Sequence, residues 1–396
     1  MHLSHKMLAL GSEPSVIREL AAYGDLRRPI VGAENVFDFS IGTPNLPTPA
    51  VVTERLQELL RGVDAFTLHS YSPAAGHPVV RQKIADVLAA RHGIAARPDL
   101  LFMTNGATAS MLYTLKALCE PGDEVIVLAP FFPEYRVYAA SAEADLVVVP
   151  PDFETFDPDV DAFARALSPR TKAVILNLPN NPTGRIYSHE ALEGMFAAMA
   201  DAERRYGRPL YLVSDEPYRE LVFDDPVPYF PALYPHTVIS YSFSKSLSLS
   251  GERIGYIQVP ETVEESEELM TAIAGAARAS GHICASTLFQ FLVADAMDWH
   301  TDAATYAKQS RAMAQGLRDV GYRVAEPQGA FYLFVQSPLS DAKAFSDLAK
   351  TRDVLVTPGD TFGVEGYLRV STCQDLDVIQ RSMPRFAALM EEVKAG

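Results

Sequence analysis

The chain has 396 residues, 48% of them hydrophobic, so it can bury a large core and should form about two or three domains. Its formal net charge of −16 disfavours a nucleic-acid partner, because phosphate backbones are bound by clustered lysine and arginine. Its three cysteines lie far apart without CxxC spacing and its nine histidines form no metal-binding motif, which disfavours a disulfide framework, a structural zinc site and metal catalysis.

The N-terminal segment, MHLSHKMLALGSEP, has too short an apolar stretch for a signal peptide. No later run approaches the ~20 apolar residues of a membrane span. We therefore expect no membrane association, and the scattered cysteines favour a reducing cytoplasm.

A turn of small residues predicts the start of a helix near residue 106. The segment Met103–Ser110 leads into a stretch with periodic apolar residues, namely Met111, Leu112, Leu115 and Leu118. Free amides at such a helix start suit a phosphate, and a plain N-cap is the competing interpretation. Downstream, Pro130–Tyr135 contains aromatic rings that could stack on a heteroaromatic cofactor or pack in the core.

The middle of the chain alternates β-branched apolar runs with amphipathic stretches, the pattern of an α/β domain with a parallel sheet. The expected strands are Glu124–Leu128, Leu146–Val149, Ala173–Leu176, Leu210–Val213, Val238–Tyr241 and Ile254–Val259. Polar clusters follow consecutive runs, at Asn177–Gly184, Asp215–Tyr218 and Ser242–Lys245. Because ligands of open α/β sheets bind beyond the carboxyl ends of strands, these clusters predict one common site.

Lys245 is the residue that most narrows the function. Its amine, flanked by Ser242 and Ser244 and followed by Arg253, could hold an aldehyde cofactor as a Schiff base while the hydroxyls and the guanidinium bind a phosphate. This combination suggests pyridoxal 5′-phosphate. Read alone, the segment favours a solvated surface lysine. The chain contains neither GxGxxG nor a P-loop, which removes the commonest nucleotide-binding interpretations.

Taken in order, the motifs resemble the fold-type I pyridoxal-phosphate enzymes, specifically the class I/II aminotransferases related to aspartate aminotransferase. The matching segments are Ile41–Pro44, Tyr71–Gly76, Asn181–Gly184, Asp215–Tyr218, the run Ser-x-Ser-Lys followed by Gly-x-Arg-x-Gly, and Tyr367–Arg369. The resemblance implies an α/β fold with a large cofactor domain, residues 46–290, built on a mostly parallel seven-stranded sheet flanked by helices. It also implies a smaller α+β domain, formed by residues 291–396 together with an N-terminal segment, residues 1–45, that acts as a lid.

The same resemblance implies the catalytic roles. Lys245 would form the internal aldimine and, once displaced by substrate, move the proton between Cα and C4′. Asp215 would hydrogen-bond the pyridine nitrogen and keep it protonated. Tyr218 and Asn181 would hydrogen-bond the phenolic oxygen of the ring, and Phe132 would stack on its face. Asn181 is also suited to the turn in which it lies.

The implied phosphate ligands are amides, hydroxyls and one guanidinium, from Gly106, Ala107, Thr108, Ser242, Ser244 and Arg253. Tyr71 would reach the phosphate in the neighbouring subunit, which implies a homodimer. Arg369 would bind the α-carboxylate of the substrate, assisted by Asn181, and the backbone of Gly42 would approach the same carboxylate.

Some residues near these motifs receive no firm role. Glu252, beside the phosphate arginine, is expected to face solvent. Arg136 and Arg278 are guesses for a cation that would bind a second substrate carboxylate, although each also fits a surface residue. The segment Gly329–Tyr332 matches the family and is assigned to packing.

The function implied is an aminotransferase that moves the amino group of an L-amino acid, aspartate or another common one, to a 2-oxo acid such as 2-oxoglutarate. A lyase of the same fold, catalysing β-elimination or cleavage of a C–S bond, is the first alternative. A non-catalytic regulator that binds the cofactor is another, but too few residues precede the resemblance for a helix-turn-helix domain. A purely structural α/β protein, without a bound aldehyde, is the last.

Overall fold

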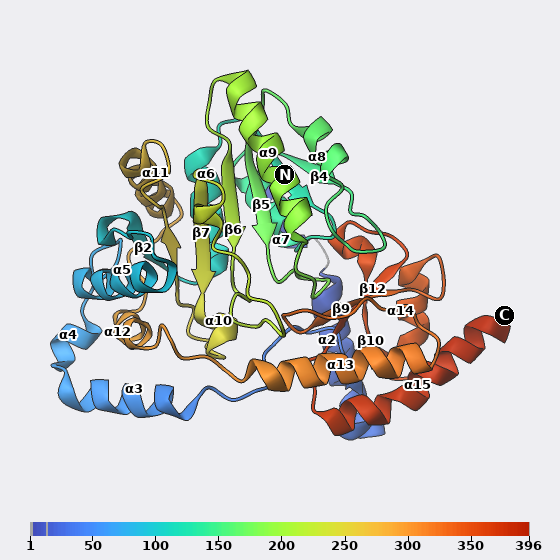
Figure 1. Cartoon of the computed structure of the whole chain (residues 1–396). Coiled ribbons are helices and arrows are strands. Elements are labelled where there is room, and N and C mark those ends of the chain that lie inside the picture. Colours follow the sequence, from blue (N-terminus) through green and yellow to red (C-terminus); the bar gives the residue numbers. More distant parts are fainter. Residues whose placement is uncertain (1–2, 13–14, 396) are drawn as a thin grey trace.

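A computed structural model describes residues 3–12 and 15–395 of the chain. At its centre is a seven-stranded sheet in the order β2-β8-β7-β6-β5-β3-β4 (Figure 1). Strand β8 runs antiparallel to both neighbours, and the other pairs are parallel. The mostly parallel seven-stranded sheet is thereby confirmed. The strands are β2 Leu101–Thr104, β3 Glu124–Leu128, β4 Asp145–Val149, β5 Thr171–Asn177, β6 Tyr211–Asp215, β7 Thr237–Ser242 and β8 Gly255–Gln258.

The expected strands agree with β3 to β8 within one or two residues at each end; β5, for example, begins two residues earlier than expected, at Thr171. Strand β2 was not expected, because its four buried residues precede the predicted helix turn without a recognisable strand pattern. The fully buried strand β3 is apolar after its first residue, Glu124, since both faces of the sheet are covered.

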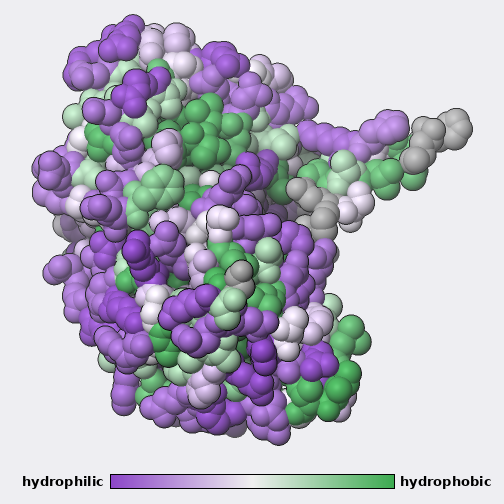
Figure 2. All heavy atoms as spheres, turned by 90° about the vertical axis from the view of Figure 1, so that its right-hand side faces the viewer, coloured by the Kyte–Doolittle hydropathy of each residue, from purple (hydrophilic) through white to green (hydrophobic). Residues whose placement is uncertain are grey.

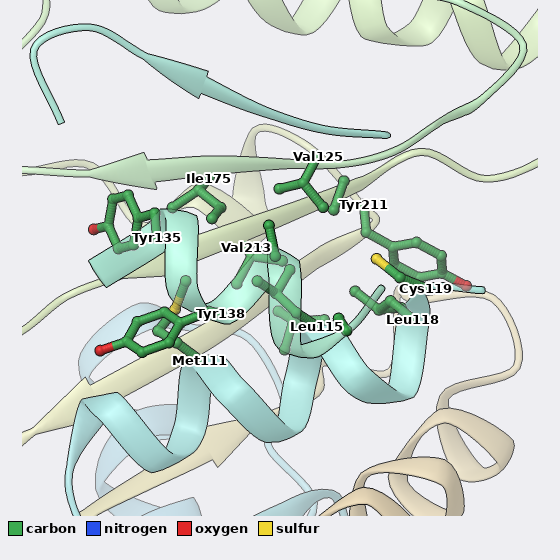
Figure 3. Close-up of a cluster of buried hydrophobic side chains, with 14 of the residues drawn as sticks. Met111, Leu115, Leu118, Cys119, Val125, Tyr135, Tyr138, Ile175, Tyr211 and Val213 are labelled. Carbon is green, nitrogen blue, oxygen red and sulfur yellow. The ribbon is translucent and has the colours of Figure 1, made fainter. Parts of the chain in front are cut away.

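Helices cover both faces of this sheet, and alternate residues of each strand belong to different cores. Val125 and Val127 of β3 pack in one cluster with α6 (Ala107–Leu118) and α11 (Ser266–Ala279). Ile126 and Leu128 pack in another with α9 (His189–Tyr206). Figure 3 shows the first cluster, in which the apolar side of α6 faces the strands. The period-two alternation of the strands thus divides the core into two layers.

The N-terminal segment joins the C-terminal part of the chain. Strand β1 (Phe37–Asp38) pairs in parallel with β10 (Val354–Leu355). A second, antiparallel sheet has the order β11-β12-β9, from Thr357–Pro358, Tyr367–Ser371 and Tyr332–Gln336. Phe37 shares a hydrophobic cluster with these strands and with α13 (Ala303–Asp319), α14 (Ala342–Lys350) and α15 (Leu376–Ala395). The arrangement supports the proposed small domain, while the boundaries at residues 45 and 290 stay predictions.

The remaining helices are α1 His5–Ser12, α2 Val16–Val31, α3 Ala50–Gly62, α4 Ala65–His69, α5 Pro78–His92, α7 Glu134–Ser141, α8 Val160–Ala166, α10 Phe243–Ser246 and α12 Thr287–Asp295. None of the helices within residues 3–12 and 15–395 is long and apolar enough to cross a membrane. Figure 2 shows one face of the molecule, on which hydrophilic side chains predominate and hydrophobic ones form separate patches.

Candidate active site

A pocket of about 270 Å³ lies at the carboxyl ends of β5, β6 and β7, next to the start of α6. Asn177 ends β5, Asp215 ends β6 and Ser242 ends β7, and all of them line the pocket. The parallel strands therefore bring the polar clusters together, as expected. The predicted site residues in its lining are Gly42, Ala107, Thr108, Phe132, Asn181, Asp215, Tyr218, Ser242, Ser244, Lys245, Arg253 and Arg369.

Lys245 lies in the short helix α10, whose N-cap Ser242 accepts a hydrogen bond from the amide of Ser244. Its Nζ donates to the carbonyl of Gly42 at 2.9 Å, so the N-terminal segment covers the amine. Burial lowers the pKa of Lys245 to about 8, with Arg253 and Arg369 acting in the same direction. A larger fraction of neutral amine is therefore present near pH 7 than in an exposed lysine, and the neutral amine is the form that can attack a carbonyl or accept a proton.

Asp215 is buried, and its two oxygens differ in their surroundings. Oδ2 accepts a hydrogen bond from the Tyr135 hydroxyl at 2.7 Å, whereas Oδ1 is buried with no partner among the described residues. Burial raises the pKa of Asp215 to about 7, and the nearby Glu216 adds to that effect while Tyr135 opposes it. A cationic N–H donor at Oδ1 would satisfy this oxygen and favour the ionised carboxylate, which fits a protonated pyridine nitrogen.

Hydroxyls, a guanidinium and a glycine form one end of the pocket. Ser242 Oγ donates to Ser244 Oγ at 2.7 Å, and Nη1 of Arg253 donates to Ser244 Oγ at 3.3 Å. Gly106 has a φ of 86°, and a Cβ built there would lie 2.7 Å from Nη2 of Arg253. The absence of that side chain leaves the first amides of α6 and the guanidinium close together. This donor set suits a phosphate group.

Arg369 forms a different end of the pocket and is 2% exposed. Its Nη1 donates to Asn181 Oδ1 at 3.2 Å and its Nη2 to the carbonyl of Ser40 at 2.6 Å. The guanidinium carbon lies 4.7 Å from the ring centres of both Tyr332 and Phe362. Burial lowers the pKa of Arg369, but guanidinium groups stay protonated in proteins. The site therefore holds a fixed, planar cation, suited to a carboxylate.

Two predicted ligands lie outside the lining of this pocket. Gly106 borders it through its contact with Arg253. Tyr71 does not line it and is 85% exposed, so within one subunit it contacts none of the phosphate-binding groups. Its proposed role across a dimer stays a prediction.

The guessed cations are elsewhere, and Glu252 is exposed, as expected. Arg136 lies over the Phe131 ring at 4.7 Å, and Arg278 is exposed on α11; neither lines the pocket. Within the described part of the chain, no group of three or more His, Cys, Asp or Glu side chains could hold a metal ion.

Sequence reasoning missed several residues of the site. Tyr332 lines the pocket, although its segment was assigned to packing, and Tyr135, which does not line it, donates a hydrogen bond to Asp215. Both lie in motifs that the sequence displayed, PFFPEY and GAFY, so their position beside known motifs was the available signal. Ile17 of α2 and Met111 of α6 also line the pocket, and their apolar side chains gave no such signal.

Together the residues fit pyridoxal 5′-phosphate: an amine for its aldehyde, a buried unpaired carboxylate oxygen for its ring nitrogen, and a phosphate-binding end. The fit depends on the chemistry of the donors and on the buried Oδ1 of Asp215.

Comparisons with known proteins agree with this site. The profile of the family described as aminotransferase class I and II matches residues 34–382. A crystal structure of an amino transferase from Eubacterium rectale is 42% identical, with a TM-score of 0.97 and coverage of 99% of both chains. The aspartate aminotransferase of Thermotoga maritima is 29% identical, over 89% of this chain and 90% of that protein. The aromatic-amino-acid aminotransferase 2 of Thermococcus litoralis is 29% identical, over 96% and 97%.

Proposed function

The chain belongs to the aminotransferase class I and II family, whose members use pyridoxal 5′-phosphate, and we propose that it moves the amino group of an L-amino acid to a 2-oxo acid with this cofactor held at Lys245. The observation that carries the proposal is one pocket lined by Lys245, Asp215 and Arg369, of which Asp215 and Arg369 are buried and Lys245 is half-buried. A covalent attachment point, a partner for a cationic ring nitrogen and a carboxylate anchor are the groups that this reaction requires.

When bound, the cofactor would supply an aldehyde for the amino group and a ring that accepts the electron pair left at Cα of the substrate. Arg369 would hold the α-carboxylate in the fork of its guanidinium and so orient the Cα–H bond. Nζ of Lys245 would accept the proton from Cα of the substrate and later donate it, acting first as base and then as acid. Its lowered pKa keeps it available as a base near neutral pH.

The remaining groups would hold charge and exclude water. Asp215 would keep the ring nitrogen protonated, while Tyr218 and Asn181 would donate to the phenolic oxygen of the cofactor. Phe132 would cover the ring face, and the Gly106 end with Arg253 would bind the phosphate. The contact between Lys245 and Gly42 supports a lid role for the N-terminal segment.

For the substrates, we propose aspartate or another common L-amino acid as donor and 2-oxoglutarate as acceptor. The names of the relatives include both aspartate and aromatic-amino-acid aminotransferases, so they leave the donor open. In the described part of one subunit, the lysine and arginine side chains that line the pocket are Lys245, Arg253 and Arg369, and each already has a proposed role. The second carboxylate of aspartate would therefore require a cation from the partner subunit.

We also propose that the enzyme is a cytoplasmic homodimer. Tyr71 and Phe66 are 85% and 80% exposed in one subunit, so both rings are free to contact a partner subunit. In the dimer Tyr71 would reach the phosphate site of the neighbour. The reduced state of the cysteines, all free in the structure, is compatible with the cytoplasm.

The test is the absorbance of purified protein, loaded with pyridoxal 5′-phosphate, while L-amino acids are added one at a time without an oxo acid. Conversion of the yellow band to the shorter-wavelength amine form by some donors supports transamination and ranks them. Release of pyruvate with persistence of the band would instead favour the lyase alternative. A protein that never acquires the band would rule out the proposed function.

A further inference from the structure

Tyr332 lies where the proposed functions of the pocket meet. It is the first residue of β9, it is 2% exposed, and it lines the pocket. Its surroundings include the hydroxyl of Tyr218, the guanidinium of Arg369 and the backbone of Gly42. Each of these groups has a separate proposed role, toward the cofactor, the substrate carboxylate and the lid.

Building on the proposed function, we propose that Tyr332 is a positioning residue that orients Tyr218, Arg369 and the segment at Gly42 together. Its hydroxyl hydrogen-bonds Tyr218, and its ring face contacts the guanidinium of Arg369. The hydroxyl end of the ring also lies against the backbone of Gly42. These contacts join residues of this chain only, so a variant can lose them while the enzyme still binds the cofactor and transaminates.

The hydroxyl contact has a preferred direction. The Oη atoms of Tyr332 and Tyr218 are 3.0 Å apart, and either could donate by geometry alone. A phenol carries a single proton, and Tyr218 must direct its own toward the phenolic oxygen of the cofactor. The bond within the pair then runs from Tyr332 to Tyr218. When Tyr218 accepts this hydrogen bond, its hydroxyl becomes a stronger donor toward the cofactor, because hydrogen bonds in a chain polarise one another.

The ring contact restrains the carboxylate anchor. The guanidinium of Arg369 lies over the rings of both Tyr332 and Phe362, with its carbon 4.7 Å from each ring centre. Hydrogen bonds to Asn181 and Ser40 restrain the edge of the same group. Its plane is thereby set before any carboxylate arrives, which lowers the entropy that binding must remove.

The third contact, between Tyr332 and Gly42, limits how closely the N-terminal segment approaches the pocket. A Cβ built at Gly42 would overlap the hydroxyl of Tyr332 and lie 2.6 Å from its Cζ. The carbonyl of Gly42 accepts the hydrogen bond from Lys245 at 2.9 Å. A side chain at position 42 would push the N-terminal segment away from the Tyr332 hydroxyl and the Lys245 amine. The close approach of this segment to Tyr332 therefore requires glycine at position 42.

The experiment compares holoenzymes of Tyr332→Phe and Tyr322→Phe. Tyr322 is a matched control, because it is also buried and donates a hydrogen bond, to the carbonyl of Phe386 in the distant C-terminal core. The first readout is the pH titration of the cofactor absorbance. Loss of the Tyr332 donor should raise the apparent pKa of that transition by roughly half a pH unit, because the phenolic oxygen becomes more basic. Tyr322→Phe should leave it unchanged.

A second pair of variants tests the ring and the lid. Tyr332→Leu, which removes the ring face, should raise KM for both donor and acceptor by roughly tenfold with a smaller change in kcat. Gly42→Ala should lower transamination more in the wild type than in the Tyr332→Leu background, because the smaller leucine leaves room for the new methyl group. This non-additivity is the signature of direct contact.

The outcomes are distinct. An unchanged absorbance titration in Tyr332→Phe, in an enzyme whose wild type binds cofactor and transaminates, would overturn the role of the hydroxyl. Additive effects of Gly42→Ala and Tyr332→Leu would overturn the lid contact, and an unchanged KM in Tyr332→Leu would overturn the role toward Arg369. A wild type without a cofactor band would reject the proposed function itself.

Discussion

Asp215→Asn should make the cofactor-free protein more stable at neutral pH while it removes activity. The carboxylate is buried and Oδ1 has no partner, so ionising it in the cofactor-free protein is costly. Burial raises its pKa from 3.8 to about 7, which at 1.36 kcal/mol for each tenfold change corresponds to about 4 kcal/mol as an upper value. Asparagine carries no charge and avoids this cost.

The sign of the pH dependence follows from the same shift. Between pH 3.8 and about 7 the folded protein binds more protons at Asp215 than the unfolded chain does. The contribution of Asp215 to the free energy of unfolding is therefore fully present below pH 3.8. It is lost as the pH rises through about 7. The wild type should lose stability relative to Asp215→Asn across this window. A cofactor that donates a cationic N–H to Oδ1 should reverse the difference.

The assay is urea unfolding of the cofactor-free proteins at about pH 5 and about pH 8, with transamination measured separately after loading. Asp161→Asn is the control, because Asp161 is exposed in the first turn of α8. We expect Asp215→Asn to gain stability at the higher pH and to lose at least roughly a hundredfold in kcat, since the ring nitrogen loses its anionic partner. A stability difference that is absent, or that does not change with pH, would refute the burial argument.

Three further variants test the rest of the site. Lys245→Ala should lower transamination by roughly a thousandfold or more, because both the attachment point and the base are lost; activity close to wild type would contradict its role, and single-turnover kinetics measure it. Arg369→Lys should raise KM for donor and acceptor by roughly ten- to a hundredfold, since an ammonium cannot make the paired contact; equal KM values in steady-state kinetics would speak against it. Gly106→Ala should weaken cofactor binding by roughly tenfold, because of its φ of 86° and the nearby Arg253, as measured by fluorescence titration. Gly93→Ala is its control, since Gly93 also has a positive φ but no atom within 4 Å of a built Cβ.

Much of the sheet and of the cofactor-binding set could be predicted from the sequence. Strand β3 coincides with the expected Glu124–Leu128, because a strand covered on both faces carries a nearly continuous apolar run, here Val125–Leu128, that is easy to recognise. Lys245, Asp215 and Arg253 were found because their chemistry is rare at such positions and because motifs of a known family surround them. The antiparallel direction of β8 could not be derived, since an apolar run carries no sign of its direction.

The guesses for a second cation failed for a related reason. Arg136 and Arg278 have the right charge, but Arg136 lies over Phe131 and Arg278 is exposed on α11. Charge is a property of a residue, whereas the direction of its side chain depends on the helix face that the core leaves free.

The family and the residue types suited to an aldehyde, a phosphate and a carboxylate can be recognised in the sequence, because they depend on side-chain chemistry and short-range order. The groups that surround these residues are known only from the folded chain. The hydroxyls of Tyr218 and Tyr332 are 114 residues apart in the chain and 3.0 Å apart in space, and Tyr135 reaches Asp215 across 80 residues. Such contacts depend on strand order, register and packing, and these follow from the cooperative burial of the whole core and are not encoded in any one segment.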